Sequence, residues 1–421
     1  MNALHKIKET IRKNGGKLVP LQKDFNAVEL MDCREKDMKR LYVEQFGPVK
    51  KADVELRDVN LFIGSQSIGK STLAKLIAIL LDNISLRKLI LAGESSWEEL
   101  LRTYNLEVYK EDEYVIVYDL MEKGICLHLE IQRNGLSSSM KINDKTITDK
   151  AEIAAAIDRL IPKKDSLASA LEVMSNSLYI PAERIIYSVI TNLLPAFTLA
   201  KASVPQNLLR FMVELENAKA TYPQYEIPLL DISYKHKGTE DYFMVHETHK
   251  EYPLTAASSG IQSIIPLLLV LQYANNHRDF LSFVIEEPEC NLFPEKQVEL
   301  LKLILAMVKN DNHILTITTH SPYLLSALNN LLFAGTLVEK YGNEIQESIN
   351  RILPEACLLK PGDCAVYSLG ENINKEGVYC RPLLDEETGM IDYNSLDGIS
   401  DRLGEDFAAL EDAFIQMKRK V

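Results

Sequence analysis

Hydrophobic and polar residues follow two different spacings along the chain, and the spacing changes several times between its ends. From Leu41 to Gly64, short apolar runs alternate with polar positions and are broken at Gly47-Pro48 and Arg57-Asp58, which predicts short strands. The segment from Lys70 to Leu81 carries apolar residues three and four positions apart, which predicts a buried helix. The apolar face of this helix consists of Leu73, Leu76, Ile77 and Leu80.

The middle of the chain mixes both spacings, and the part that follows alternates them regularly. Residues 98–150 predict a helix followed by strands, residues 151–225 are mostly helical in pattern, and residues 226–254 return to strands. From Gly260 onward helix and strand patterns alternate, which is typical of a parallel sheet flanked by helices. The alternating segments are 261–273, 281–287, 297–308, 313–320 and 322–332. The sequence therefore predicts an α/β fold with a mixed sheet flanked by helices.

The composition is that of an acidic globular protein. The chain has 421 residues, of which 46% are hydrophobic, and its 47 Lys and Arg against 60 Asp and Glu give a net charge of −13. This charge argues against binding nucleic acid over the whole surface, so any DNA contact should be local or made by a partner. The N-terminus lacks the apolar core of a secretion signal, and the longest apolar stretch, Ile264–Leu271, is too short to span a bilayer. We expect a cytoplasmic protein with no membrane partner.

A phosphate-binding loop follows the apolar strand Val59–Ile63 and precedes the helix at Lys70. Residues 64–72 match G-x-x-x-x-G-K-[ST] in full, and in such a loop backbone N–H groups close around phosphate oxygens. Lys70 would reach the β- and γ-phosphates, and the Ser71 hydroxyl would help to hold Mg²⁺. The alternative, an ordinary Gly/Ser turn, is disfavoured by the complete motif in this context. The residues predicted to bind nucleotide here are Gly64, Ser65, Gln66, Ser67, Ile68, Gly69, Lys70, Ser71 and Thr72.

Two further strands end in residues that can act on a bound triphosphate. The apolar run Leu281–Ile285 ends in Glu286, predicted to hold Mg²⁺, and Glu287, predicted to take a proton from the attacking water. The strand Ile314–Thr318 is followed by His320, which could bind that water or sense the γ-phosphate. Taken alone, the acids could form a solvated turn and the histidine could be structural. Their order after the phosphate loop favours the catalytic interpretation.

A Ser- and Gly-rich loop, residues 257–263, precedes the helix that begins near Ile261. Ser259 and Gly260 would present a hydroxyl and a backbone N–H group at a helix start, where anions bind, although a simple serine N-cap is the alternative. With the motifs above, this loop resembles the signature of ATP-binding-cassette ATPase heads, which closes on the γ-phosphate of the partner subunit's ATP. The resemblance implies ATP and Mg²⁺ as cofactors. It assigns nucleotide contacts to Ser258, Ser259, Gly260 and Gln262.

Within that class, the sequence resembles the stand-alone ATPases of the overcoming-lysogenization-defect, RecF and SMC group. The matching segments are FGPVKKADVEL, YIPAER, SSGIQS, IEEPECNLFP and TTHSPYLL. The resemblance implies an ATP-dependent homodimer or higher oligomer that controls a separately encoded effector, such as a nuclease, in antiphage defence or DNA maintenance. It also implies that Arg184 lies near the head surface and touches nucleotide or the partner subunit, although a surface salt bridge fits equally well. Residues 336–421 contain no Asp-x-Asp pair, so no TOPRIM nuclease domain is expected.

Two other functions fit parts of the pattern. The chain could be the cytoplasmic ATPase subunit of a transporter, but SSG in place of LSGG, the EEPE run and the long interval before the signature favour the DNA-maintenance branch. A regulatory module that senses ATP and turns it over slowly stays open. The motifs divide the chain into a basic arm (1–40), a first head lobe (41–97), a β-rich and helical insertion (98–250), a second head lobe (251–335) and an acidic tail suited to partner docking (336–421).

Overall fold

The computed structural model describes residues 37–110, 112–122, 124–142, 145–158, 176–190, 205–277, 282–308, 313–370, 379–385, 387–392 and 404–411. The predicted basic arm lies outside these ranges except for residues 37–40. Parts of the predicted insertion and tail also lie outside them.

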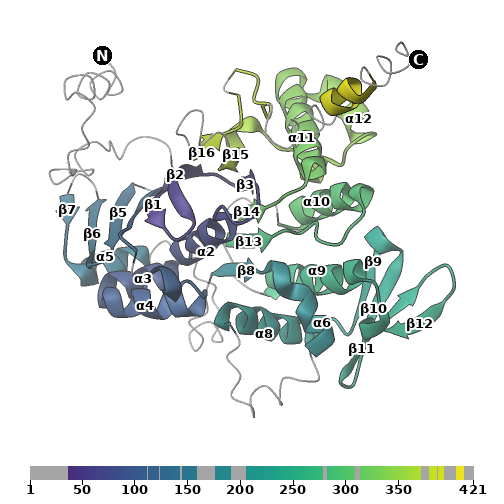
Figure 1. Ribbon diagram of the computed structural model, residues 1–421, viewed down its shortest axis with the longest axis horizontal. Helices are drawn as coiled ribbons and strands as arrows, with labels where there is room; N and C mark the ends of the chain where they lie inside the picture. Colours follow the sequence, from purple (N-terminus) through teal and green to yellow (C-terminus); the bar gives the residue numbers. More distant parts are fainter. Residues whose placement is uncertain are drawn as a thin grey trace, which may run out of the picture. The chain divides into compact units, whose positions relative to one another are not determined.

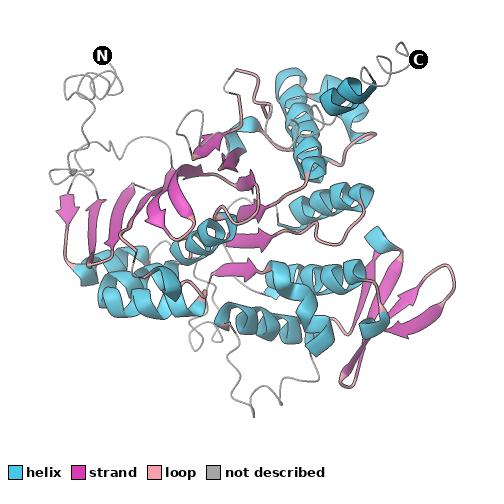
Figure 2. Cartoon of the chain, in the orientation of Figure 1, coloured by secondary structure: helices cyan, strands magenta, loops and turns pink. Residues whose placement is uncertain are grey.

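A six-stranded sheet forms the centre of the described structure (Figure 1). Its order is β16-β15-β3-β14-β13-β8, in which the five strands from β15 to β8 are parallel and β16 is antiparallel. The strands are β3 (Val59–Gly64), β8 (Ser177–Ile180), β13 (Ser282–Glu286), β14 (Ile314–Thr318), β15 (Cys364–Leu369) and β16 (Cys380–Pro382). Helices flank this mixed sheet (Figure 2), so the predicted α/β fold class is confirmed.

Helices cover both faces of the central sheet, which explains why the residues of its parallel strands are almost all buried. In β3, Leu61 and Ile63 belong to one core and Phe62 to another. The first core includes α8 (Gln206–Thr221), α9 (Ser259–His277), α10 (Pro294–Val308) and α11 (Pro322–Tyr341). The second includes α2 (Lys70–Leu80), α3 (Asn83–Ala92), α4 (Glu94–Thr103) and α5 (Lys150–Ile157). Among the described residues, no helix is both long and apolar enough to cross a membrane.

Two antiparallel sheets lie outside the central one. The larger, in the order β2-β1-β4-β5-β6-β7, packs into the second core. It contains β1 (Met38–Phe46), β2 (Val49–Leu56), β4 (Val115–Glu122), β5 (Ile125–Gln132), β6 (Gly135–Ile142) and β7 (Lys145–Ile147). The smaller, in the order β12-β11-β10-β9, packs into the first core and contains β9 (Gln224–Ile227), β10 (Ile232–Lys237), β11 (Glu240–Val245) and β12 (Lys250–Pro253). The short helices α6 (Ile186–Ile190) and α12 (Asn343–Asn350) follow β8 and α11 in the chain.

Strand pairing crosses every predicted boundary of the head. The boundary at residue 97 separates β1 from β4, although the two are paired along their length. The predicted insertion contributes β8, which pairs with β13, and the predicted tail contributes β15, which pairs with β3. The boundaries at 97, 250 and 335 therefore do not coincide with the structural units. The reason is that sheet partners here are far apart in sequence, and hydrophobic spacing identifies a strand without identifying its neighbour.

Two truncations should separate the part of the predicted tail that belongs to the central sheet from the part that does not contribute to stability. A chain ending at Asp363 loses β15, whose six residues are all buried against β3, so we expect it to be insoluble or to lack a cooperative melting transition. A chain ending at Asp392 keeps β15 and β16 and loses helical residues 404–411, all of which are exposed, so its melting temperature should stay within about 3 °C of the full chain. Circular dichroism melts measure both. A soluble shorter chain with the full-length melting temperature would show that β15 is dispensable.

Candidate nucleotide site

The phosphate-binding loop joins β3 to α2 with a backbone that its glycines permit. Gly64, Ser67 and Gly69 have φ angles of 144°, 61° and 94°. A Cβ atom at Gly69 would lie 2.7 Å from the Val49 side chain, so the close approach of the β1–β2 hairpin also requires glycine. No side chain of the described residues caps α2. The first N–H groups of this helix are therefore available to an anion.

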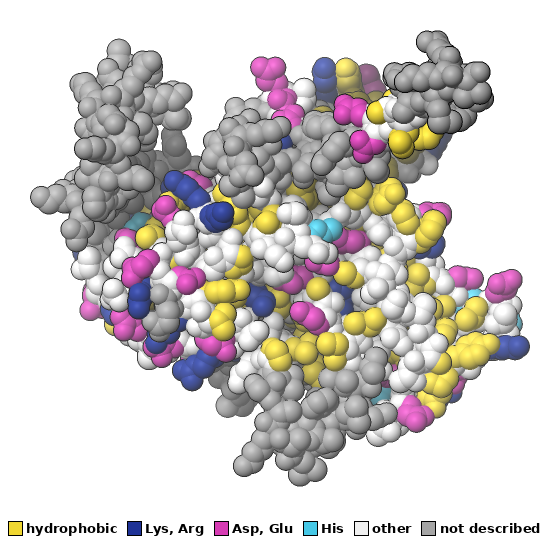
Figure 3. Space-filling view, in the orientation of Figure 1, with side chains coloured by type: hydrophobic (Ala, Val, Ile, Leu, Met, Phe, Trp, Pro, Cys, Tyr) yellow, Lys and Arg dark blue, Asp and Glu magenta, His cyan; other side chains and the backbone are white. Residues whose placement is uncertain are grey.

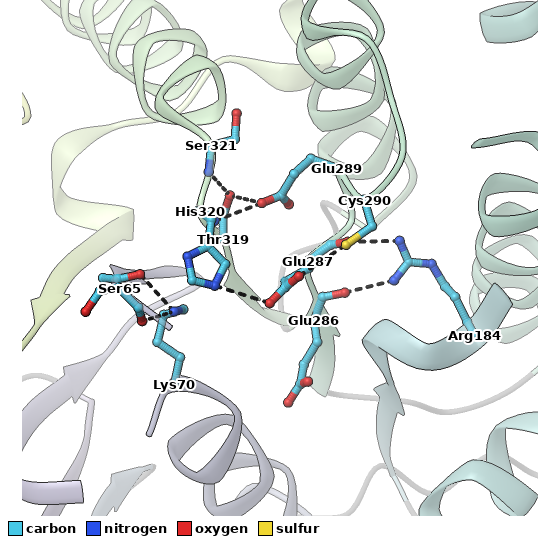
Figure 4. A network of polar contacts seen from close by, with 11 residues as sticks. Ser65, Lys70, Arg184, Glu286, Glu287, Glu289, Cys290, Thr319, His320 and Ser321 are labelled. Carbon is cyan, nitrogen blue, oxygen red and sulfur yellow. Dashed lines mark hydrogen bonds and ion pairs between the residues drawn. The ribbon is translucent and has the colours of Figure 1, made fainter. Parts of the chain in front are cut away.

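Lys70 lies buried inside the loop that it follows (Figure 4). Its Nζ donates hydrogen bonds to the carbonyl oxygens of Gly64 at 2.9 Å and Ser65 at 2.8 Å. Burial lowers the pKa of Lys70 to about 8, against the opposing charges of Glu287, Glu289 and Glu286. The ammonium group is thus held at the loop by two neutral acceptors that a phosphate could replace.

Glu286 is buried at the end of β13, beside Ser71 at the start of α2. Its Oε1 accepts a hydrogen bond from the Tyr179 hydroxyl at 2.8 Å. Burial raises the pKa of Glu286, while the Tyr179 hydrogen bond, the charge of Lys75 and the nearby Ser71 hydroxyl act in the opposite direction. Carboxylate and hydroxyl oxygens are ligands that Mg²⁺ prefers. The two residues predicted to hold the metal therefore lie together and fit it chemically.

Glu287 meets His320 where β13 and β14 end side by side (Figure 4). Glu287 Oε1 lies 3.3 Å from His320 Nε2, and Cys290 Sγ donates to Glu287 Oε2 at 3.1 Å. The hydrogen bond with His320, followed by that with Cys290, lowers the pKa of Glu287 to about 2 in spite of its partial burial. Its φ of 41° is unusual for a residue other than glycine, so its surroundings must fix the backbone. The carboxylate is ionised at neutral pH and points at His320.

Glu289 is a site residue that the sequence analysis does not single out. Its Oε1 accepts hydrogen bonds from the Thr319 hydroxyl and, at 2.9 Å, from the backbone N–H of His320. Burial raises the pKa of this carboxyl group. Glu289 therefore holds the backbone that carries His320. The acid is visible in the EEPE run, but its partners lie on another strand and cannot be found from local spacing.

The signature residues divide into an exposed pair and a buried pair. Ser258 and Ser259 are exposed at the start of α9, as a contact with a second subunit requires. Gly260 is buried, and a Cβ atom there would lie 2.8 Å from the Asn291 carbonyl oxygen. Gln262 is also buried, and its Nε2 lies 3.1 Å from the carbonyl oxygens of both Leu254 and Thr255. The predicted nucleotide contact of Gln262 is therefore not supported, because its amide already holds the preceding loop.

The predicted surface position of Arg184 is wrong. Its side chain is fully buried, and its guanidinium donates to backbone carbonyl oxygens, including those of Glu286 and Glu287, each at 2.9 Å (Figure 4). The sequence shows an arginine after a short apolar strand, which is equally typical of a surface residue. Burial follows from the parallel pairing of β8 with β13, which brings the turn after β8 against the backbone at the end of β13.

Tyr379, from the predicted tail, holds the phosphate-binding loop and was also not predicted. Its hydroxyl lies within hydrogen-bonding distance of the Ile68 carbonyl oxygen and 2.8 Å from that of Pro48. A Cβ at Gly64 would lie 2.5 Å from the Leu369 carbonyl oxygen, so β15 is packed closely against the loop. The C-terminal part of the chain therefore shapes the nucleotide site.

Five residues therefore lie together at the carboxyl ends of the central strands: Lys70, Ser71, Glu286, Glu287 and His320. A family model described as "AAA ATPase domain" matches residues 38–192 and 136–325, which together span the site. The chain belongs to the AAA ATPase domain family. Its fold is that of a P-loop NTPase head, as the sequence analysis predicts.

Solved structures of ATPase heads are similar to this AAA ATPase at low sequence identity. The SMC head domain from Thermotoga maritima is 14% identical with a TM-score of 0.38, and 69% of this chain and 92% of that one are covered. An SMC head bound to the C-terminal winged-helix domain of ScpA is 13% identical with a TM-score of 0.37, at 69% and 92% coverage. An ATP-binding cassette of an ABC transporter, in its ADP conformation, is 13% identical with a TM-score of 0.28, at 70% and 85% coverage. No curated protein matches the sequence.

The affinity of this AAA ATPase for ATP should fall at alkaline pH. Triphosphate binding favours protonated Lys70, whose pKa in the free protein is about 8. Above that pH the association constant should decrease, by up to about tenfold per pH unit. Titration with a fluorescent ATP analogue from pH 6.5 to 9.5 at fixed ionic strength measures the effect. In Lys70→Arg the cation stays charged and the dependence should disappear. A flat affinity in the unmodified protein would contradict the role of Lys70.

Proposed function

We propose that this AAA ATPase hydrolyses ATP as a cassette-type head that closes into a dimer around two nucleotides. The proposal rests on three features that lie together at the carboxyl ends of the central strands. They are the Lys70 loop, the neighbouring residues Ser71 and Glu286, and the Glu287–His320 pair. These are the three parts that phosphoryl transfer to water requires: a phosphate cradle, oxygen ligands for a metal ion, and a carboxylate for the water.

Binding of ATP would place its phosphates at the N-terminus of α2. Lys70 would exchange the carbonyl oxygens of Gly64 and Ser65 for phosphate oxygens, which bear more negative charge. Ser71 and Glu286 would hold Mg²⁺, which when bound neutralises charge on the phosphates. Tyr179 would keep the Glu286 carboxylate oriented, since its hydroxyl donates to Oε1.

Glu287 would accept the proton of the attacking water. Its low pKa of about 2 makes it a weak base while His320 and Cys290 both bond to it. Movement of His320 toward the γ-phosphate would break its hydrogen bond with Glu287, which is the larger of the two that lower this pKa, and would make Glu287 a stronger base. His320 would in this way link the presence of a γ-phosphate to the strength of the base.

A dimer explains the exposed residues near the site. Ser258 and Ser259 are exposed at the start of the long helix α9, where an anion is favoured. Phe293, in the loop after β13, has 76% of its surface exposed, which is unusual for a large apolar side chain. In the dimer that the sequence resemblance implies, the two serines and Phe293 would face a second copy of the chain. Ser259 would then reach the γ-phosphate of the ATP bound to that copy.

The role of hydrolysis in the cell rests on the sequence resemblance. We propose that the ATP cycle controls a separately encoded effector, such as a nuclease, in bacterial antiphage defence or DNA maintenance, in the cytoplasm. The net charge of −13 favours DNA contact through that effector or through a local site. On the face shown in Figure 3, acidic and basic side chains of the described residues are interspersed, which fits this division.

Replacing the proposed base should trap the dimer. Glu287→Gln should lower the hydrolysis rate at least about 100-fold, because the amide cannot accept the proton, while ATP affinity changes little. With ATP and Mg²⁺ the variant should elute as a dimer in size-exclusion chromatography with light scattering, and it should be monomeric with ADP. Hydrolysis at the unmodified rate would show that Glu287 is not the base.

Blocking the signature should abolish hydrolysis without abolishing nucleotide binding. Ser259→Arg places a long side chain where the partner's phosphate would lie, so turnover should fall at least about tenfold while the affinity of the isolated subunit for ATP stays the same. Ser326→Arg, on the exposed face of α11, is the matched control and should be active. Unchanged turnover in Ser259→Arg would contradict a site completed by a second copy.

A further inference from the structure

Arg184 has an unusual environment for a cation. It lies in the short 3-10 turn Ala182–Ile185 after β8, with 0% of its surface exposed. Each of its five N–H groups has a backbone carbonyl oxygen as acceptor. A buried cation normally needs a carboxylate partner, because desolvation costs several kcal/mol. Here the described neighbours supply a ring of carbonyl dipoles instead.

Four of the five carbonyl groups come from two parts of the chain that serve different parts of the proposed reaction. Three belong to the last residue of β13 and the two that follow it, from Glu286 and Glu287 at 2.9 Å and Pro288 at 3.1 Å. One belongs to Ser263 in the first turns of α9, at 3.3 Å from Nε. The fifth, from Pro181 at 3.2 Å, fixes the turn that carries the arginine itself. The guanidinium therefore bridges the base-bearing loop and the signature helix.

Other contacts support the same junction. Gly260 lies directly against the Asn291 carbonyl oxygen, and the Ser188 hydroxyl donates to the Gln262 carbonyl oxygen at 3.0 Å. The start of α9 is thus packed against the loop after β13 through Gly260 and against α6 through Ser188. Arg184 is the contact that supplies charge, and it acts where the backbone of Glu287 has a φ of 41°.

We propose that Arg184 is a positioning residue that holds the Glu287 backbone in its left-handed conformation and ties it to the signature helix. Three neighbouring carbonyl groups that converge on one point repel one another unless a cation lies between them. Arg184 removes this repulsion and so fixes the direction of the Glu287 carboxylate. The inference rests on the proposed role of Glu287 as base and adds a residue that touches neither nucleotide nor water.

Arg184→Lys tests the proposal. A lysine keeps the charge but has three N–H donors on a flexible stem, so it cannot reach both elements at once. We expect kcat to fall about 10- to 100-fold, as for a small misplacement of a catalytic group, with KM for ATP and the affinity for a fluorescent ATP analogue within about twofold. Arg40→Lys, which affects an exposed pair with Asp53, is the control and should leave both parameters unchanged. Should the lysine variant not fold, the neutral Arg184→Gln carries no buried charge and should show the same loss of kcat.

A double substitution separates positioning of the base from general loss of structure. If Arg184 acts through Glu287, adding Arg184→Lys to Glu287→Gln should change the remaining single-turnover rate by less than about twofold. If the double variant is slower than Glu287→Gln by the same factor that Arg184→Lys alone loses, the two residues act independently and the proposal is overturned. A kcat for Arg184→Lys within about twofold of the unmodified protein would also overturn it. If Glu287→Gln itself hydrolyses ATP at the unmodified rate, the base assignment fails and this inference fails with it. If only Arg184→Lys is fully active, the proposed function stands and the inference alone fails.

Discussion

Lys70 lies buried at the carboxyl edge of the central sheet beside Glu286, Glu287 and Glu289, and the balance of these four charges constrains the rest of the site. The parallel order β3-β14-β13 creates the constraint, since it brings three strand ends to one edge. The three acids are not equivalent. Burial raises the pKa of Glu286 and Glu289, whereas the hydrogen bond with His320 lowers that of Glu287. Different environments thus suit similar side chains to the different tasks proposed for them, as with paired carboxylates in enzymes.

The sequence was sufficient to identify candidate site residues that lie close together in the chain. The loop 64–72, the pair Glu286–Glu287 and His320 are recognisable because each follows an apolar strand within a few positions. The alternation of helices and strands from Gly260 to Leu332 was predictable for the same reason, and it determined the fold class. Local spacing carries both signals, since a phosphate loop needs only a strand before it and a helix after it.

What the sequence could not predict depends on contacts between distant residues. Tyr179 meets Glu286 across 107 positions, and Tyr379 meets Ile68 across 311. Arg184 was misplaced because its five acceptors lie on three separate segments, so no local pattern indicates burial. The predicted boundaries at 97, 250 and 335 differ from the structure for the same reason. Each cuts between strands whose pairing is decided by packing rather than by order in the chain.

The pairing of β3 has a consequence for synthesis of the protein. Both neighbours of this strand, β14 and β15, begin more than 250 positions after it in the printed sequence. As the chain leaves the ribosome, the strand that leads into the phosphate loop has neither neighbour in the sheet until most of the chain has been made. Such non-local pairing folds slowly, and unpaired strand edges favour aggregation. Nascent chains should therefore acquire ATP binding late and depend on chaperones until then.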